Sequence, residues 1–137
     1  MDWITDQIAI GNYLDAQDVE LLRREGIASI LCLDGSLAGR APADLGVRKI
    51  AVVKLTDGPG NDRDTFFRAV DALSRFVGEW PPVLVQCHAG RSRSPVIVAG
   101  HFIRTRGVQP PEALRLVAAK RELQVTPGLD SMLWHLA

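Results

Sequence analysis

The residues with the clearest chemistry lie at 84–95 and read Leu-Val-Gln-Cys-His-Ala-Gly-Arg-Ser-Arg-Ser-Pro. A short apolar run ends at Cys87, Arg93 follows six residues later, and a helical pattern starts near Ser94 and Pro95. A strand, a tight loop and a helix start form an anion cradle, because loop N–H groups point inward and the helix adds its positive end. An arginine can grip two phosphate oxygens at once. A thiol in such a cradle ionises readily and can attack phosphorus. The segment therefore predicts a nucleophilic site for phosphate esters.

Cleavage of a phosphate ester also needs a proton for the leaving oxygen, and a carboxylic acid facing the loop is the usual donor. Three acids follow a predicted strand at 47–55, namely Asp57, Asp62 and Asp64. Asp57 comes first, in a loop whose glycines and proline suit movement over a substrate. Asp62 is expected to cap the next helix, and Asp64 lies in its first turn, where acids favour the dipole. Asp57 is therefore the predicted general acid, with Asp62 as the alternative.

These residues together resemble the signature loop of the cysteine-dependent protein tyrosine phosphatase superfamily, and within it the small dual-specificity branch. Besides Cys87 and Arg93, the likeness lies in Ala89-Gly90 and Ser92-Arg93-Ser94. The acid precedes the cysteine, unlike the order in low-molecular-weight tyrosine phosphatases. Weaker likenesses at 8–12 and 121–128 extend it over nearly the whole chain. The resemblance implies one catalytic domain over residues 1–137, with an α/β fold and a central, mostly parallel sheet of about four to five strands flanked by helices.

The resemblance also implies a phosphomonoester hydrolase that acts through a phosphocysteine. Cys87 is the expected nucleophile, Arg93 the oxyanion clamp, Asp57 the general acid and Ser94 the hydroxyl that eases departure of the thiolate. The phosphate is expected to contact the loop residues His88, Ala89, Gly90, Arg91, Ser92 and Arg93. No metal or cofactor is expected, because arginine and backbone dipoles supply the positive charge. The implied substrate is phosphotyrosine in proteins, with phosphoserine and phosphothreonine as further candidates.

The chain departs from this family at Gln86, where most relatives carry histidine before the cysteine. Glutamine can donate hydrogen bonds but carries no charge, so we expect a less readily ionised thiol and slower turnover. Two alternatives stay open. Arg91 and His88 give the loop a likeness to relatives that act on phosphoinositides or phosphatidylglycerophosphate. Gln86 is also compatible with a pseudophosphatase, which binds phosphorylated partners without hydrolysing them.

Composition narrows the class of protein. The chain has 137 residues, with 16 basic and 16 acidic side chains, so no global charge favours nucleic acid or a membrane surface. Two cysteines are too few for a disulfide framework. No apolar run reaches membrane-spanning length, and the N-terminus lacks the pattern of a signal peptide. We therefore expect a cytoplasmic monomer without stable membrane insertion.

The spacing of apolar residues predicts the helices and strands that position these side chains. Helices are expected from Asp15 to about Glu25, after Asp62, and at about 95–106, 111–122 and 128–134. Strands are expected at about 4–10, 28–33, 47–55 and 83–86, with a loop at 34–46. Ligands in such α/β sheets bind beyond the carboxyl ends of the strands. Cys87 and Asp57 both follow a strand, so we expect them to meet at one edge.

Overall fold

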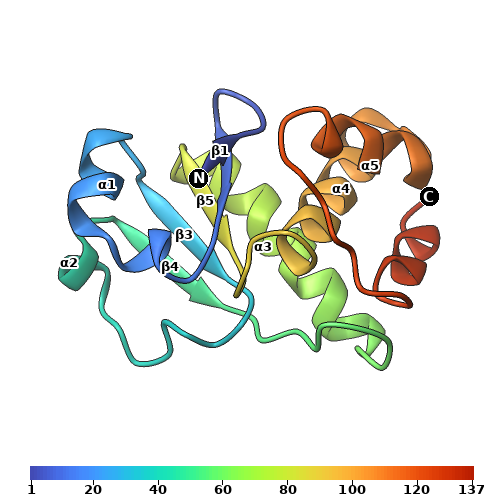
Figure 1. Ribbon diagram of the computed structural model, residues 1–137, viewed down its shortest axis with the longest axis horizontal. Coiled ribbons are helices and arrows are strands. Elements are labelled where there is room, and N and C mark those ends of the chain that lie inside the picture. Colours follow the sequence, from blue (N-terminus) through green and yellow to red (C-terminus); the bar gives the residue numbers. More distant parts are fainter.

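A computed structural model describes residues 1–137 and shows one five-stranded sheet (Figure 1). The strands lie in the order β1-β2-β5-β3-β4, and only β1 runs antiparallel to its neighbour. Their bounds are β1 (Asp2–Trp3), β2 (Ile8–Gly11), β3 (Ser29–Cys32), β4 (Lys49–Val52) and β5 (Val83–Gln86). This arrangement confirms the predicted α/β class with a mostly parallel sheet.

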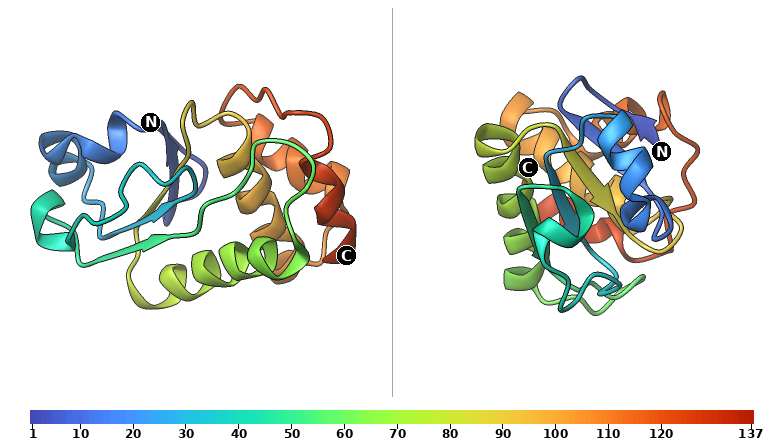
Figure 2. Two further views of the ribbon diagram at one scale, coloured as in Figure 1. Left: turned by 90° about the horizontal axis from the view of Figure 1, so that it is seen from below. Right: turned by 90° about the vertical axis from the view of Figure 1, so that its left-hand side faces the viewer.

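Helices cover both faces of the sheet, because successive strand side chains point to opposite sides. One face packs against α1 (Val19–Arg24) and α2 (Pro42–Leu45); the other packs against α3 (Arg63–Glu79), α4 (Arg93–Arg106) and α5 (Pro110–Ala118). The two short 3-10 helices are η1 (Asp15–Gln17) and η2 (Asp130–His135). Figure 2 shows the sheet between these two groups of helices. None of the helices has both the length and the apolar character needed to cross a membrane.

The central strand β5 places the predicted nucleophile. In the ladder, Gln86 at the end of β5 pairs with Gly11 of β2 on one side and with Cys32 of β3 on the other. The carboxyl ends of three parallel strands therefore lie at one edge of the sheet. Cys87 is the first residue after β5, so it emerges in the middle of that edge.

Several predicted boundaries were wrong for local reasons. Asp18, not Asp15, caps α1 by accepting a hydrogen bond from Leu21 N–H, because the Asp15 carboxylate instead accepts from Asn12 N–H. The expected loop at 34–46 contains the one-turn helix α2, which Pro42 starts and the left-handed Gly46 ends. The helix expected at 111–122 ends at Ala118.

The strands also differ from the prediction. The expected strand at 4–10 is a hairpin of β1 and β2 joined by residues 4–7. The run at 47–55 pairs regularly only over β4, although Val53 N–H and Leu55 N–H still donate to Cys32 and Leu33 carbonyls. The last segment, expected as a helix at 128–134, forms the 3-10 helix η2.

Candidate active site

The loop after β5 shapes one wall of a pocket of about 330 Å³. We call residues 87–93 the cysteine loop; α4 begins at its last residue. Its turn requires Gly90, whose φ of +70° is a left-handed conformation that other residues rarely adopt. A Cβ at Gly90 would also lie 2.6 Å from the Gly11 carbonyl oxygen. The close approach of the loop to β2 therefore depends on glycine at this position.

The pocket gathers most of the predicted site residues. Only two of its nine lining residues are hydrophobic. The lining residues are Asp57, Cys87, His88, Ala89, Arg91, Ser92, Arg93, Gln124 and Thr126. Cationic side chains come from the cysteine loop, and Asp57 is the one carboxylate in the lining. The arrangement suits a small, strongly anionic group.

Cys87 lies at the positive end of α4. Its side chain is buried, and Sγ accepts a hydrogen bond from Ser94 N–H at 3.5 Å. Negative charge on sulfur is favoured there by the helix dipole and by this N–H group. The Ser94 hydroxyl is also buried and has no hydrogen-bond partner within the protein. It is therefore free to donate to a group in the site.

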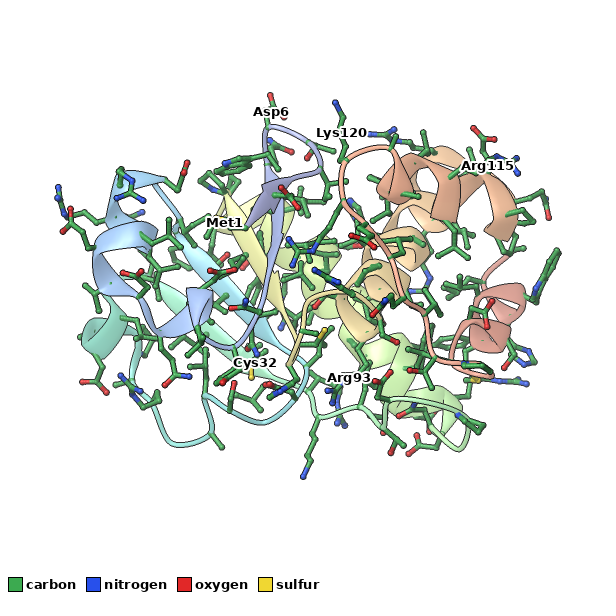
Figure 3. All side chains as sticks on the ribbon, viewed as in Figure 1. Met1, Asp6, Cys32, Arg93, Arg115 and Lys120 are labelled. Atoms are coloured by element: carbon green, nitrogen blue, oxygen red, sulfur yellow. The ribbon has the colours of Figure 1, made fainter.

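Arg93 connects the cysteine loop to the segment that carries the predicted acid. Its Nη1 donates to the Leu55 carbonyl oxygen at 3.1 Å, and its buried Nε has no partner. Figure 3 shows Arg93 and Cys32 at the same edge of the sheet, where the parallel strands end. The guanidinium therefore keeps unused donors beside the cysteine loop.

Asp57 reaches the pocket from the segment after β4. Its Oδ1 accepts a hydrogen bond from Ser92 Oγ at 2.6 Å. The same hydroxyl oxygen accepts from Thr126 N–H at 3.0 Å. The structure thus brings Asp57 onto the cysteine loop, as the sequence predicted.

The alternative acid, Asp62, has a different position. Its carboxylate caps α3 by accepting from Thr65 N–H and from the Thr65 hydroxyl, both at 2.8 Å. These bonds to Thr65 lower the pKa of Asp62. Asp62 does not line the pocket. Asp57 is therefore the acid that the geometry favours.

Two further loop residues, His88 and Arg91, form the rim of the pocket. The His88 ring stacks on Tyr13 with centroids 4.5 Å apart, and its carbonyl oxygen accepts from Tyr13 N–H at 3.0 Å. The exposed Arg91 lines the pocket, and its carbonyl oxygen accepts from Gln124 N–H at 2.9 Å. Both backbones are tied to neighbouring segments, and both side chains stay at the entrance.

Gln86 belongs to a buried polar group behind the cysteine. Its Nε2 donates to Ser36 Oγ and to the Cys87 carbonyl oxygen, each at 3.1 Å, whereas its Oε1 has no partner. The Ser36 hydroxyl in turn donates to Asp34 at 2.7 Å. Burial alone would raise the pKa of Asp34, but hydrogen bonds from Ser36, Gln86 and Cys32 together hold it below its ordinary value. A carboxylate thus anchors a chain of bonds that ends on the nucleophile's own peptide group.

Arg121 is a residue to which the sequence assigned no role at the site. Its Nε donates to the Gly90 carbonyl oxygen at 2.6 Å, and Nη2 donates to that of Ala89 at 3.3 Å. Nη1 pairs with the Asp2 carboxylate at 2.9 Å. These bonds tie the carbonyl oxygens of the cysteine loop, through Arg121, to β1. The sequence signal was the likeness at 121–128, which gave no function for the arginine.

Comparison with known proteins decides the family. The sequence model of "Dual specificity phosphatase, catalytic domain" matches residues 42–135, more than half of the chain. The chain belongs to the dual specificity phosphatase family. Dual specificity phosphatase 28 of Mus musculus is 31% identical over 119 residues, which cover 86% of this chain and 71% of that protein. This family assignment confirms the cysteine-dependent phosphatase class predicted from the sequence.

Two further relatives agree with the assignment. Dual specificity protein phosphatase 1 of Arabidopsis thaliana is 27% identical over 119 residues, covering 86% of this chain. The match spans only 59% of that relative's length. A crystal structure of a mouse putative dual specificity phosphatase, complexed with zinc tungstate, superposes with a TM-score of 0.83 at 27% identity. That superposition covers 98% of this chain and 84% of the mouse chain and confirms the fold.

Proposed function

We propose that this dual specificity phosphatase hydrolyses phosphotyrosine in proteins, and phosphoserine and phosphothreonine as well, through a phosphocysteine on Cys87. The observation that carries the proposal is the pocket itself. It joins a thiol at a helix N-terminus, an arginine with unused donors and a carboxyl group from another segment. These are the parts that transfer of a phosphoryl group to sulfur requires.

In the first step, the Cys87 thiolate attacks phosphorus in line with the leaving oxygen. A sulfur–phosphorus bond forms and the phosphorus–oxygen bond breaks, while Asp57 gives its proton to the departing alcohol. Arg93 and the N–H groups of residues 88–93 stabilise the charge on the equatorial oxygens.

In the second step, water attacks the phosphocysteine and Asp57 accepts its proton. The sulfur–phosphorus bond breaks, inorganic phosphate forms, and the thiolate is regenerated. The Ser94 hydroxyl, which has no other partner, donates to the departing sulfur. The Asp57 carboxyl thus regains the proton that it lost in the first step.

The test compares the wild type with Cys87→Ser and Asp57→Asn. We expect Cys87→Ser to abolish hydrolysis of p-nitrophenyl phosphate and of a phosphotyrosine peptide. We expect Asp57→Asn to lower kcat on the peptide by about 100-fold or more and to remove the alkaline decline of kcat. Vanadate binding should persist in Asp57→Asn, because the cysteine loop is intact. Equal background rates in the wild type and Cys87→Ser would leave only a phosphate-binding pseudophosphatase.

The substrate class is tested with a second panel. Phosphotyrosine, phosphoserine and phosphothreonine peptides are compared with phosphoinositides and phosphatidylglycerophosphate in detergent. We expect kcat/KM to be highest for the phosphotyrosine peptide. A higher value for a lipid headgroup would overturn the protein substrate and favour the lipid alternative.

The cellular setting is proposed on the same grounds. A thiolate nucleophile needs a reducing compartment, which favours the cytoplasm. We also propose that the chain acts as a monomer and does not bind nucleic acid, since its formal charge is balanced. Size-exclusion chromatography with light scattering checks the oligomeric state.

A further inference from the structure

We propose that Ser92 is a positioning residue for the general acid: its side chain anchors Asp57, and its contribution to catalysis passes through that carboxyl group. This inference deepens the proposed function and rests on it. The family resemblance placed Ser92 among the phosphate-binding residues. Its hydroxyl, however, contacts Asp57 and Thr126.

The direction of the Ser92 hydroxyl follows from its neighbours. Thr126 N–H donates to the Ser92 oxygen at 3.0 Å, so one lone pair is already engaged. The single hydroxyl proton has two acceptors nearby, Asp57 Oδ1 at 2.6 Å and Thr126 Oγ1 at 3.4 Å. The shorter bond goes to a carboxylate, and bonds to charged acceptors are the stronger ones. The proton is therefore directed to Asp57.

This contact distinguishes the two oxygens of Asp57. Oδ1 is held by Ser92, whereas Oδ2 has no hydrogen-bond partner within the protein. Oδ2 is consequently the atom that carries the proton to the leaving oxygen. The Asn61 side chain bonds the backbone of Thr56 and Gly58 on either side of Asp57, but it leaves the Asp57 carboxyl group unheld. The bond from Ser92 is the one that fixes this carboxyl group to the cysteine loop.

Three segments meet at this hydroxyl. Asp57 comes from the segment after β4, Ser92 from the cysteine loop and Thr126 from the segment before η2. Ser92 is buried, with 7% of its surface exposed, whereas Asp57 is exposed. The bond therefore ties an exposed carboxyl group to a buried part of the cysteine loop, which limits its movement relative to the cysteine. A proton donor held in this way supplies orientation as well as acidity.

Asp57 has few other charged or titratable neighbours. The pocket lining holds two charged side chains, Arg91 and Arg93, and two titratable ones, His88 and Cys87, all from the cysteine loop. The segment before η2 contributes only the neutral Gln124 and Thr126 to the lining. Substituting Ser92 leaves every one of these groups in place.

The experiment uses Ser92→Ala, Asp57→Asn and the double variant. We measure kcat/KM for a phosphoserine peptide, whose leaving alcohol needs a proton, and for p-nitrophenyl phosphate, whose leaving group does not. We expect Ser92→Ala to lower the first value about tenfold and the second less than about twofold. The alkaline decline of kcat on the peptide should also move to higher pH, because the carboxylate loses its donor.

The double variant decides whether Ser92 acts through Asp57. We expect Ser92→Ala to have no further effect on the phosphoserine peptide once Asp57→Asn is present. If the two substitutions together lower kcat/KM by the product of their separate effects, or if Ser92→Ala lowers it equally on both substrates, Ser92 serves phosphate binding or loop structure. Either result would overturn the inference. Thr105→Val, at the far end of α4, is the control for loss of a hydroxyl.

Two outcomes separate this inference from the proposed function. If Asp57→Asn fails to slow the phosphoserine peptide, Asp57 is not the acid and the proposed mechanism fails first. If Asp57→Asn slows it but Ser92→Ala does not, the mechanism stands and only the anchoring role is lost.

If Ser92→Ala does not fold, Thr126→Val serves in its place, since it keeps the N–H donor and removes only the competing acceptor. We expect Thr126→Val to strengthen the bond from Ser92 and to move the alkaline decline to lower pH; an upward shift or none would overturn the inference.

Discussion

Gln86 stands where the family resemblance leads us to expect histidine, and its surroundings show how glutamine fits. The amide is fully buried, donates to Ser36 and to the Cys87 carbonyl oxygen, and leaves Oε1 without a partner. An unsatisfied buried acceptor costs about 1–3 kcal/mol. Glutamine therefore fixes the peptide group of the nucleophile but supplies no positive charge to its sulfur.

We predict that Gln86→His increases turnover. An imidazolium beside Asp34 would favour the thiolate, so the acid-side rise of kcat/KM should begin at lower pH. Gln86→Leu is the matched control, because it removes the donors without adding charge. We expect it to slow turnover but to change the free energy of unfolding by less than about 1 kcal/mol, because loss of the two donor bonds is offset by removal of the unsatisfied Oε1. A pH–rate profile that does not move in Gln86→His would contradict the role assigned to charge.

At the scale of elements, Arg121 connects the cysteine loop to β1. We predict that Arg121→Met weakens vanadate binding and lowers the free energy of unfolding by about 2–4 kcal/mol, because the Gly90 and Ala89 carbonyls lose charged donors. Asp2→Asn should cost less than about 1 kcal/mol, since half of the Asp2 side chain is exposed. Vanadate titration and urea unfolding measure both effects. Unchanged vanadate affinity in Arg121→Met would show that the loop holds its shape without this contact.

The same elements show which features the sequence could predict. The strand, loop and helix around Cys87 were predictable because an apolar run, a glycine and a helix start are adjacent in the chain. The contact of Arg121 with Gly90 joins residues 31 apart, so no local pattern indicates it. The start of α1 was misplaced because both Asp15 and Asp18 suit a cap, and the Asp15 carboxylate is instead engaged by Asn12 N–H and by the N-terminal amine of Met1. The helix α2 escaped prediction because a single turn between Pro42 and Gly46 looks like a loop.

At the scale of the whole molecule, the formal charge is zero but its distribution is uneven. Arg91 and Arg93 gather at the pocket, where the N-terminus of α4 also lies. Such a cleft attracts anionic substrates although the protein as a whole has no net charge. The two cores on either side of the sheet hold the strand ends, and hence these groups, in fixed relation.

The buried His101 makes the stability of the fold depend on pH. Burial lowers the pKa of His101 below its usual 6.5, and nearby Arg106 lowers it further. Its Nδ1 lies 2.9 Å from the Ser74 hydroxyl. Above its ordinary pKa the imidazole is neutral in both the folded and the unfolded chain. As the pH falls below that value, the unfolded chain takes up the proton first, so the folded state loses stability. Asp34, whose pKa is also lowered, adds a second loss only at more acidic pH.

We therefore predict that the free energy of unfolding declines as the pH falls through and below about 6.5, by at most about 1.4 kcal/mol per pH unit from this one group. Urea unfolding at a series of pH values measures the decline. His101→Gln keeps a side chain that can hydrogen-bond Ser74 but cannot titrate, so its curve should be flatter over this range. His135→Gln removes an exposed imidazole and should decline like the wild type. Parallel curves for His101→Gln and the wild type would mean that the decline arises elsewhere in the molecule, because removing this titration would then have changed nothing.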